Sequence, residues 1–331
     1  MGVLHRSIGS WPLRIARWSV FVAACVYLYH HLAGAQGTLL LPRVGRTELV
    51  CILAAFLGVA LNWGLEAWKW RRLIAAVVHV PFIVALRATL AGTTIGLITP
   101  NRTGEFIGRV ALLPVGYRAK ASFVTMLGSA AQFVVTILMG GSAMVLFHWT
   151  GTGRPCDGLW WYPLLVGTFV LGTVTLAVLM RPSMIIALVA LVPFPGHRAL
   201  LAARALRAVD RRTILATLAS SIARYIVFAV QFTLLLHALA GVAWGPALLT
   251  VAVIFLCTTL IPTAVLTEIG VRGSVAMALL GPNVSDPAGV AAATLLLWTM
   301  NLALPALVGG VVLLLERSIA RRSVSPSCVP A

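Results

Sequence analysis

The stretch FIVALRATLAGTTIGLITPNRTGEFIGRVALL, residues 82–113, decides how this chain folds. An apolar piece (82–98) is followed by a break at Pro100-Asn101-Arg102 and then by a second piece (103–113) that contains charge. As a helix rising 1.5 Å per residue, the second piece reaches only about 17 Å, too short to cross a hydrocarbon core of about 30 Å. We therefore predict a re-entrant helical hairpin, which enters and leaves the membrane on one side.

A second stretch, residues 246–281, repeats this order. An apolar piece (246–261) precedes a break at Pro262-Thr263-Ala264, and a shorter piece (268–281) follows it. This shorter piece extends to only about 21 Å as a helix, so it cannot cross alone either. We predict a second re-entrant hairpin, whose broken backbone must face protein or a wet cavity because lipid cannot satisfy its polar groups.

The composition of the whole chain agrees with a membrane location for both hairpins. Of 331 residues, 60% are hydrophobic and 10% charged, and the mean hydropathy is +0.99. A soluble domain has about 45–50% apolar and about 25% charged residues. We predict an all-α polytopic membrane protein with six full spans in addition to the two hairpins. The spans are expected at 18–34, 48–68, 121–147, 160–180, 213–240 and 288–315.

The net charge of +17 sets the predicted orientation. Its arginines lie in short gaps between apolar runs, as in cytoplasmic loops, and not on an arm or face that could bind nucleic acid. An inside N-terminus with two hairpins puts the six arginines of 181–212 inside, whereas a full span at 82–98 would put them outside. We expect both termini in the cytoplasm and a multi-pass protein of the plasma membrane, that is, a bacterial inner membrane. The run 18–34 also fits a cleaved signal peptide, since Ala33-Gly34-Ala35 resembles a cleavage site, but we favour a retained span.

This topology predicts an inverted repeat within one membrane domain, 1–331. The first repeat (1–147) and the second (160–316) each contain two spans, a hairpin and a third span, with the hairpins entering from opposite sides. The second repeat carries an insertion at 181–212, and a cytoplasmic tail follows at 317–331. A basic amphipathic surface helix is predicted over 198–212, with a solvated connector as the alternative.

Eight charged side chains fall at membrane depth in this topology. Each costs about 2.5–3.5 kcal/mol at the centre of a spanning helix, so they must pair or line a polar cavity. Lys69 is counted with the loops. The eight are Arg87, Arg102, Arg109, Arg224, Arg272, Glu66, Glu105 and Glu268.

The pairs Glu105-x-x-x-Arg109 and Glu268-x-x-x-Arg272 mark the two hairpins. A spacing of four places Glu and Arg on one helix face in the favourable order for an ion pair. We predict a substrate site of Arg102, Glu105, Arg109, Arg224, Glu268 and Arg272, in which the arginines match a phosphate group. The alternative is a set of internal salt bridges that only neutralises buried charge.

Four side-chain amides lie in the predicted spans. They could line the cavity or bind backbone groups, and we favour backbone groups. No metal or cofactor is predicted, because the five cysteines and seven histidines show no ligand spacing. The amides are Asn62, Gln132, Gln231 and Asn301.

The sequence PNRTGEFIGR at 100–109, with EIGVRGS at 268–274, resembles the lysylphosphatidylglycerol synthase transmembrane-region family, the flippase-like domain proteins. The resemblance covers nearly the whole chain. It implies translocation of an aminoacylated or otherwise modified lipid between leaflets. A Gly-rich turn that the family often carries is replaced here by 263–267. The residues that match the family's hairpins are Arg102, Gly104, Glu105, Arg109, Gly270 and Arg272. The backbone of the two hairpins is assigned to Pro100, Gly104, Pro262 and Gly270.

We therefore expect a lipid flippase-like transporter that is not an enzyme. Its partners would be membrane lipids with anionic or zwitterionic headgroups. Without a soluble synthase domain, such lipids would come from a separate lipid-synthesising enzyme. The alternatives are a small-solute or ion transporter on the same scaffold and an integral-membrane lipid-modifying enzyme, for which two carboxylates could act as acid and base. The sequence indicates no oligomeric state.

Overall fold

A computed structural model of the chain describes residues 26, 45–99, 104–150, 161–191, 197–261, 265–280, 284 and 286–322. Within these ranges the chain is helical and contains no strand, which confirms the all-α prediction. Five helical segments in this described part of the chain are long and apolar enough to cross a membrane, as expected for a membrane protein. The predicted span 18–34 lies outside the described residues, apart from Val26. The five are α2 (Arg46–Ile74), α5 (Val115–Thr150), α6 (Trp161–Leu179), α9 (Arg211–Ala240) and the continuous pair α12 (Pro287–Trp298) and α13 (Leu304–Arg322).

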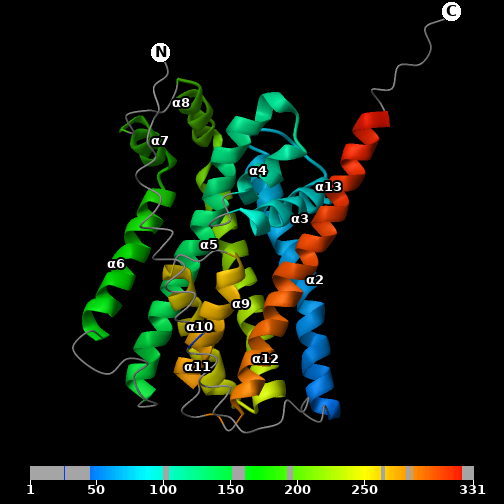
Figure 1. The fold of residues 1–331 in the computed structure, drawn as a ribbon. Coiled ribbons are helices and arrows are strands. Elements are labelled where there is room, and N and C mark those ends of the chain that lie inside the picture. The colour runs from blue at the N-terminus through cyan, green and yellow to red at the C-terminus, as the bar shows by residue number, and fades with distance from the viewer. Residues whose placement is uncertain are drawn as a thin grey trace, which may run out of the picture.

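Helices α2 and α9 pack against each other, with α2 on the right side of the bundle in Figure 1 and α9 nearer its middle. The amide of Gln231 on α9 donates to the carbonyl oxygen of Ala55 on α2, with an N···O distance of 2.7 Å. Gly58 leaves the space that this side chain occupies. Gln231 therefore satisfies a backbone group, as predicted.

Two pairs of short helices pack against these two long helices. Helix α3 (Phe82–Ile98) packs on α4 (Gly104–Ala111), and α10 (Trp244–Leu260) packs on α11 (Val265–Leu280). Figure 1 shows the first pair in the upper half of the bundle and the second in the lower half. The connecting residues 100–103 and 262–264 lie outside the described part of the chain. Helix α11 begins at Val265, three residues before the predicted start.

Each pair is packed against a long helix from the other half of the chain, and a glycine permits the close approach. Helix α3 packs on α13, where a Cβ at Gly309 would lie only 2.0 Å from the carbonyl oxygen of Leu90. Helix α10 packs on α5, where a Cβ at Gly140 would lie 2.5 Å from the Cβ of Leu256. Small residues of this kind allow helix backbones to come together inside a membrane.

One turn of π-helix, Thr299–Ala303 (η4), joins α12 to α13. Pro305 explains it, because proline has no N–H to donate and its ring clashes with the carbonyl four residues earlier. That carbonyl belongs to Asn301, a buried residue whose side chain turns toward α2. Turns of this kind often accompany functional sites.

The 181–212 insertion folds as several short elements, so the prediction of one helix over 198–212 is wrong. They are α7 (Pro182–Leu191), α8 (His197–Ala203) and a 3-10 turn, Arg204–Ala208 (η2). The chain then breaks because Asp210 caps α9, accepting from the N–H of Thr213 at 2.9 Å. Hydrogen bonds from the Thr213 side chain and N–H hold the pKa of Asp210 below its ordinary value.

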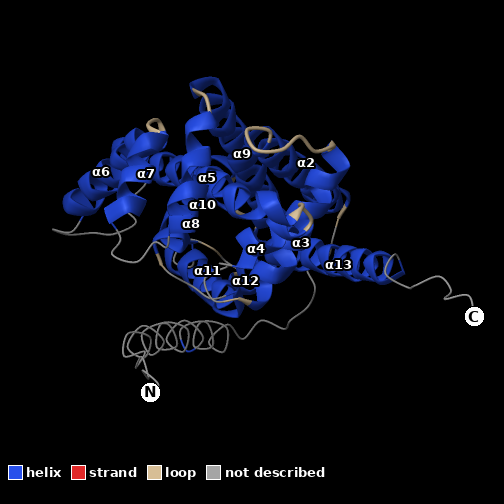
Figure 2. Ribbon diagram, turned by 90° about the horizontal axis from the view of Figure 1, so that it is seen from above, coloured by secondary structure: helices blue, strands red, loops and turns tan. Residues whose placement is uncertain are grey.

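The amphipathic character predicted for this insertion is nevertheless present. Leu206 and Val209 are buried against α2 and α5, while Arg204 and Arg207 are exposed. The same apolar cluster includes Leu73. Because Leu73 follows directly on Arg71 and Arg72, the exposed arginines of α2, of η2 and of the start of α9 lie at the same end of the bundle. We call this the basic end; its arginines are Arg71, Arg72, Arg204, Arg207, Arg211 and Arg212. Seen from above, α6 and α7 lie on one side and α13 on the other (Figure 2).

Candidate functional site

The inward face of α2 carries three buried polar residues. Asn62, Glu66 and Lys69 are spaced by four and three residues, which places them on one side of a helix. Each is at most 3% exposed. This face is directed toward α9 and the α3/α4 pair, so its polar groups need partners from those helices.

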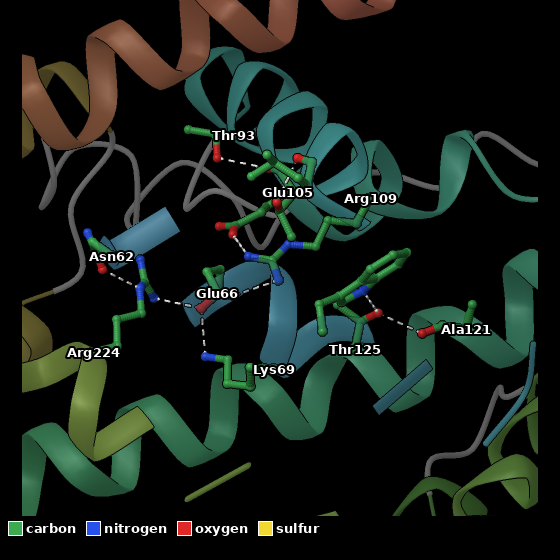
Figure 3. A network of polar contacts seen from close by, with 12 residues as sticks. Asn62, Glu66, Lys69, Thr93, Glu105, Arg109, Ala121, Thr125 and Arg224 are labelled. Atoms are coloured by element: carbon green, nitrogen blue, oxygen red, sulfur yellow. Dashed lines mark hydrogen bonds and ion pairs between the residues drawn. The ribbon is translucent and has the colours of Figure 1, made fainter. Parts of the chain in front are cut away.

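Glu66 is the centre of a network of ion pairs (Figure 3). One carboxylate oxygen lies 2.7 Å from Nη1 of Arg109 on α4. The other lies 2.7 Å from Nζ of Lys69 and 2.9 Å from Nη1 of Arg224 on α9. Arg109 also pairs with Glu105 on its own helix, as the four-residue spacing predicts. A single buried carboxylate therefore connects α2, α4 and α9.

A close contact between α3 and α4 places Arg109 there. The Cα of Gly92 lies 2.6 Å from the position of a Cβ built on Gly108. In the same way, a Cβ on Gly92 would lie 2.6 Å from Cγ of Arg109 and 2.9 Å from the backbone oxygen of Glu105. The two glycines thus let the Arg109 stem cross the face of α3 on its way to Glu66.

Arg224 extends the network toward η4. Its Nε donates to Oδ1 of Asn62 at 2.8 Å, and Nδ2 of Asn62 donates to Oδ1 of Asn301 at 2.7 Å. The guanidinium also lies 5.9 Å from the centre of the Trp63 ring, within cation–π range. These contacts fix a cation that is still partly exposed, with 24% of the side chain accessible.

The exposed part of Arg224 faces a cavity of about 340 Å³. Arg272 on α11 lines the same cavity. Among the described residues, its lining contains two arginines and no carboxylate, together with amides, hydroxyls and aromatic rings. A volume of this size suits a small polar group. The amides are Asn62, Gln132 and Asn301; the hydroxyls Thr136, Tyr225, Thr258 and Thr259; the rings Trp63, Phe228, Phe255 and Trp298.

Arg272 lies against two phenylalanines. Its guanidinium carbon is 5.6 Å from the ring centre of Phe228 on α9 and 5.8 Å from that of Phe255 on α10. The residue is 9% exposed. The rings that hold it stack on one another, with centres 4.9 Å apart. Aromatic faces attract a guanidinium by cation–π interaction, and the planar fork of a guanidinium matches the geometry of a phosphate.

The structure thus brings Glu105, Arg109 and Arg224 together around Glu66 and places Arg272 on the cavity that Arg224 lines. Gly104 begins α4, and its N–H donates to Oγ1 of Thr99 at 2.8 Å. The side chain of Glu268, together with Pro100, Arg102 and Pro262, lies outside the described part of the chain, and Gly270 is buried in α11.

Arg87 lies away from the site. Its side chain is half exposed and pairs with Glu316 on α13 at 3.6 Å.

The structure changes the sequence-based interpretation of two residues, Lys69 and Asn62, and extends that of a third, Asn301. Lys69 was counted with the loop charges, which is wrong, because it is 2% exposed and bound to Glu66. The spacing Glu66-x-x-Lys69, with Glu first, is a signal that could have identified the pair. Asn62 was expected to satisfy a backbone group, whereas it bonds Arg224 and Asn301. Asn301 does donate to the backbone oxygen of Leu297, at 3.3 Å, and it also accepts from Asn62. Both amides line the cavity.

Within the described residues, no group of three His, Cys, Asp or Glu side chains could hold a metal ion.

A comparison of the chain with protein-family models and with curated protein sequences finds no match.

Proposed function

We propose that this protein moves a phosphate-bearing lipid headgroup between the leaflets of a membrane, without changing it chemically. The cavity lined by Arg224 and Arg272 carries this proposal. A cation inside a membrane protein is costly unless it is paired or serves a polar ligand. Arg224 is only partly neutralised, since Glu66 also binds two other cations.

The packing of the helices supports an inverted repeat around that cavity. Each short-helix pair packs on a long helix of the other half, α3 on α13 and α10 on α5, and the two helices that precede the pairs, α2 and α9, pack on each other. A twofold exchange of the halves would produce this pattern. In transporters built this way, the substrate site lies where the broken helices of the two repeats meet.

In this mechanism the two arginines hold the phosphate by forked hydrogen bonds. Glu66 and Asn62 keep Arg224 oriented, and Phe228 and Phe255 keep Arg272 oriented. The acyl chains remain in the bilayer while the headgroup passes. The basic end would face the cytoplasm by the positive-inside rule, which agrees with a bacterial inner-membrane protein.

This function is the one implied by the resemblance to the lysylphosphatidylglycerol synthase transmembrane-region family, in which we propose to place the chain. The supporting residues are the hairpin motifs, of which Glu105 and Arg109 pair as described. The lipid would come from a separate enzyme.

A headgroup-accessibility assay in proteoliposomes tests the proposal. Fluorescent phosphatidylglycerol is placed in both leaflets, and a membrane-impermeant reductant reports how fast the inner pool becomes accessible. Wild-type protein should speed this exchange over protein-free liposomes, whereas Arg224→Gln and Arg272→Gln should slow it at least about tenfold, the loss of one charge-assisted bond.

Arg87→Gln is the matched control, because Arg87 is exposed and lies on no wall of the cavity. It should behave as wild type. Exchange at the protein-free rate with wild-type protein would refute lipid translocation, and equal rates in all variants would remove the two arginines from it.

A further inference from the structure

The outer face of α2 carries a second polar feature, at the basic end. A hollow of about 590 Å³ is lined by Trp68, Arg71, Arg72, His79 and Pro81, among others. Both arginines are exposed, and the guanidinium carbon of Arg72 lies 4.7 Å from the Trp68 ring centre. An ordered cation beside a tryptophan is typical of the interface between hydrocarbon and headgroups.

An apolar stripe leads from this hollow along α2. Leu57, Leu61 and Trp68 are exposed to 73%, 55% and 38%, and helical spacing places them in line with Arg72. Leu57 to Trp68 spans about 17 Å, close to the roughly 15 Å depth of one hydrocarbon leaflet. Gly64 lies on the same line, and a Cβ there would meet no atom within 4 Å, so the stripe is notched below Trp68.

We propose that this face is a binding site for an anionic phospholipid of the leaflet at the basic end. Its phosphate lies between Arg71 and Arg72, and one acyl chain follows the stripe through the notch at Gly64. Charge favours this occupant over a zwitterionic lipid, because each interfacial arginine adds about a fivefold preference for an anionic surface.

This site is separate from the central cavity. Asn62, Glu66 and Lys69 point from α2 toward the network, on the side of the helix opposite Leu57, Gly64 and Trp68. A lipid held outside α2 would therefore bear on the helix that orients Arg224 without competing for the cavity. The proposal does not depend on the function proposed above.

Native mass spectrometry tests it. The full-length protein in detergent is mixed with equal amounts of phosphatidylglycerol and phosphatidylcholine, and the retained lipids are counted by mass. Wild type should retain phosphatidylglycerol preferentially. Arg71→Gln/Arg72→Gln should lose about 30-fold in that preference, the product of two such charges. Gly64→Leu should weaken retention while leaving every charge in place, and since the site is open it should not disturb folding.

Further variants test whether the loss of lipid is specific to Arg71 and Arg72. Arg211→Gln/Arg212→Gln removes an equal charge from another exposed arginine pair at the basic end and should not change the preference. Both arginine-pair variants are also compared on an Arg224→Gln background, so that lipid held in the central cavity does not contribute to the count. Unchanged retention in Arg71→Gln/Arg72→Gln would overturn the proposal. Displacement of the lipid by millimolar inorganic phosphate would also overturn it, by showing a site for soluble anions.

Discussion

The two short-helix pairs carry the same motif in different surroundings. In the α3/α4 pair, Arg109 is 5% exposed and enclosed by Glu66 and Glu105. In the α10/α11 pair, Arg272 lines the cavity and rests on Phe228 and Phe255. Arg109 therefore belongs to a closed set of ion pairs, whereas Arg272 borders the cavity, where it is a candidate ligand-binding cation.

The neighbouring long helix makes this difference. Helix α2 presents a carboxylate, Glu66, to the first pair, whereas α9 presents an aromatic ring, Phe228, to the second. The charged residue of α9, Arg224, turns instead toward α2. The role of an arginine in this fold therefore depends on the side chains that the adjacent helix presents to it.

The largest effect is expected for Glu66→Gln. Removing the carboxylate leaves Lys69, Arg109 and Arg224 close together without the negative charge that they share. Removing one partner of a buried ion pair costs about 3–5 kcal/mol. The yield of folded protein and its unfolding free energy in denaturing detergent should both fall. Glu316→Gln is the control, since Glu316 is 41% exposed, and should match wild type. A Glu66→Gln protein as stable as wild type would show that the network does not hold the fold.

Substitution of the two motif arginines, Arg109 and Arg272, should lower the unfolding free energy by different amounts. Arg109→Gln leaves Glu105 and Glu66 short of a buried cation and should cost about 3 kcal/mol. Arg272→Gln leaves the ion pairs of Glu66 intact and should cost less than Arg109→Gln. Both are measured by the same detergent unfolding. Equal losses would mean that the two pairs do not differ in the way described.

A bulky residue at Gly92 should disturb the first pair alone. Gly92→Leu would push against the Arg109 stem and the Glu105 carbonyl, and overpacking of this kind costs about 1–3 kcal/mol. Gly167→Leu on α6 meets no atom within 4 Å and should be neutral or slightly stabilising. If both substitutions behave alike in thermal unfolding, the close contact of α3 with α4 is not what positions Arg109.

The smallest effect is expected at Asp210, whose helix α9 serves both pairs. Its pKa is lowered on folding, so the cap stabilises the protein above the ordinary carboxyl pKa, and this contribution fades as the pH falls through the folded value. Asp210→Ala should lower the melting temperature slightly at neutral pH, and less at acidic pH. A constant difference at every pH would exclude the carboxylate as the cause.

The sequence predicts the helices well because apolar length and breaks at proline are local signals. The five long helices and both short-helix pairs lie where hydropathy places them, and the Glu105–Arg109 pair follows from spacing alone. The insertion was misjudged because Asp210 caps α9 and ends the preceding segment. A capping residue starts a new helix even where the amphipathic pattern continues through it.

The site could be predicted only in part, because its partners are distant in sequence. Nothing near Arg224 indicates that it binds Glu66, and nothing near Asn62 indicates Asn301. The π-turn that aims Asn301 depends on Pro305, which looks like any proline in an apolar run. Local spacing finds the pairs within a helix, whereas the contacts between helices need the fold.

The central claim is that Arg224 and Arg272 hold one phosphate between them. A double-mutant cycle on lipid exchange in proteoliposomes tests it most directly, using Arg224→Gln, Arg272→Gln and the double variant. If both arginines bind the same group, the double variant should be scarcely slower than the slower single variant. A double variant slowed by the product of the two single losses, or either single variant exchanging at the wild-type rate, would contradict the account.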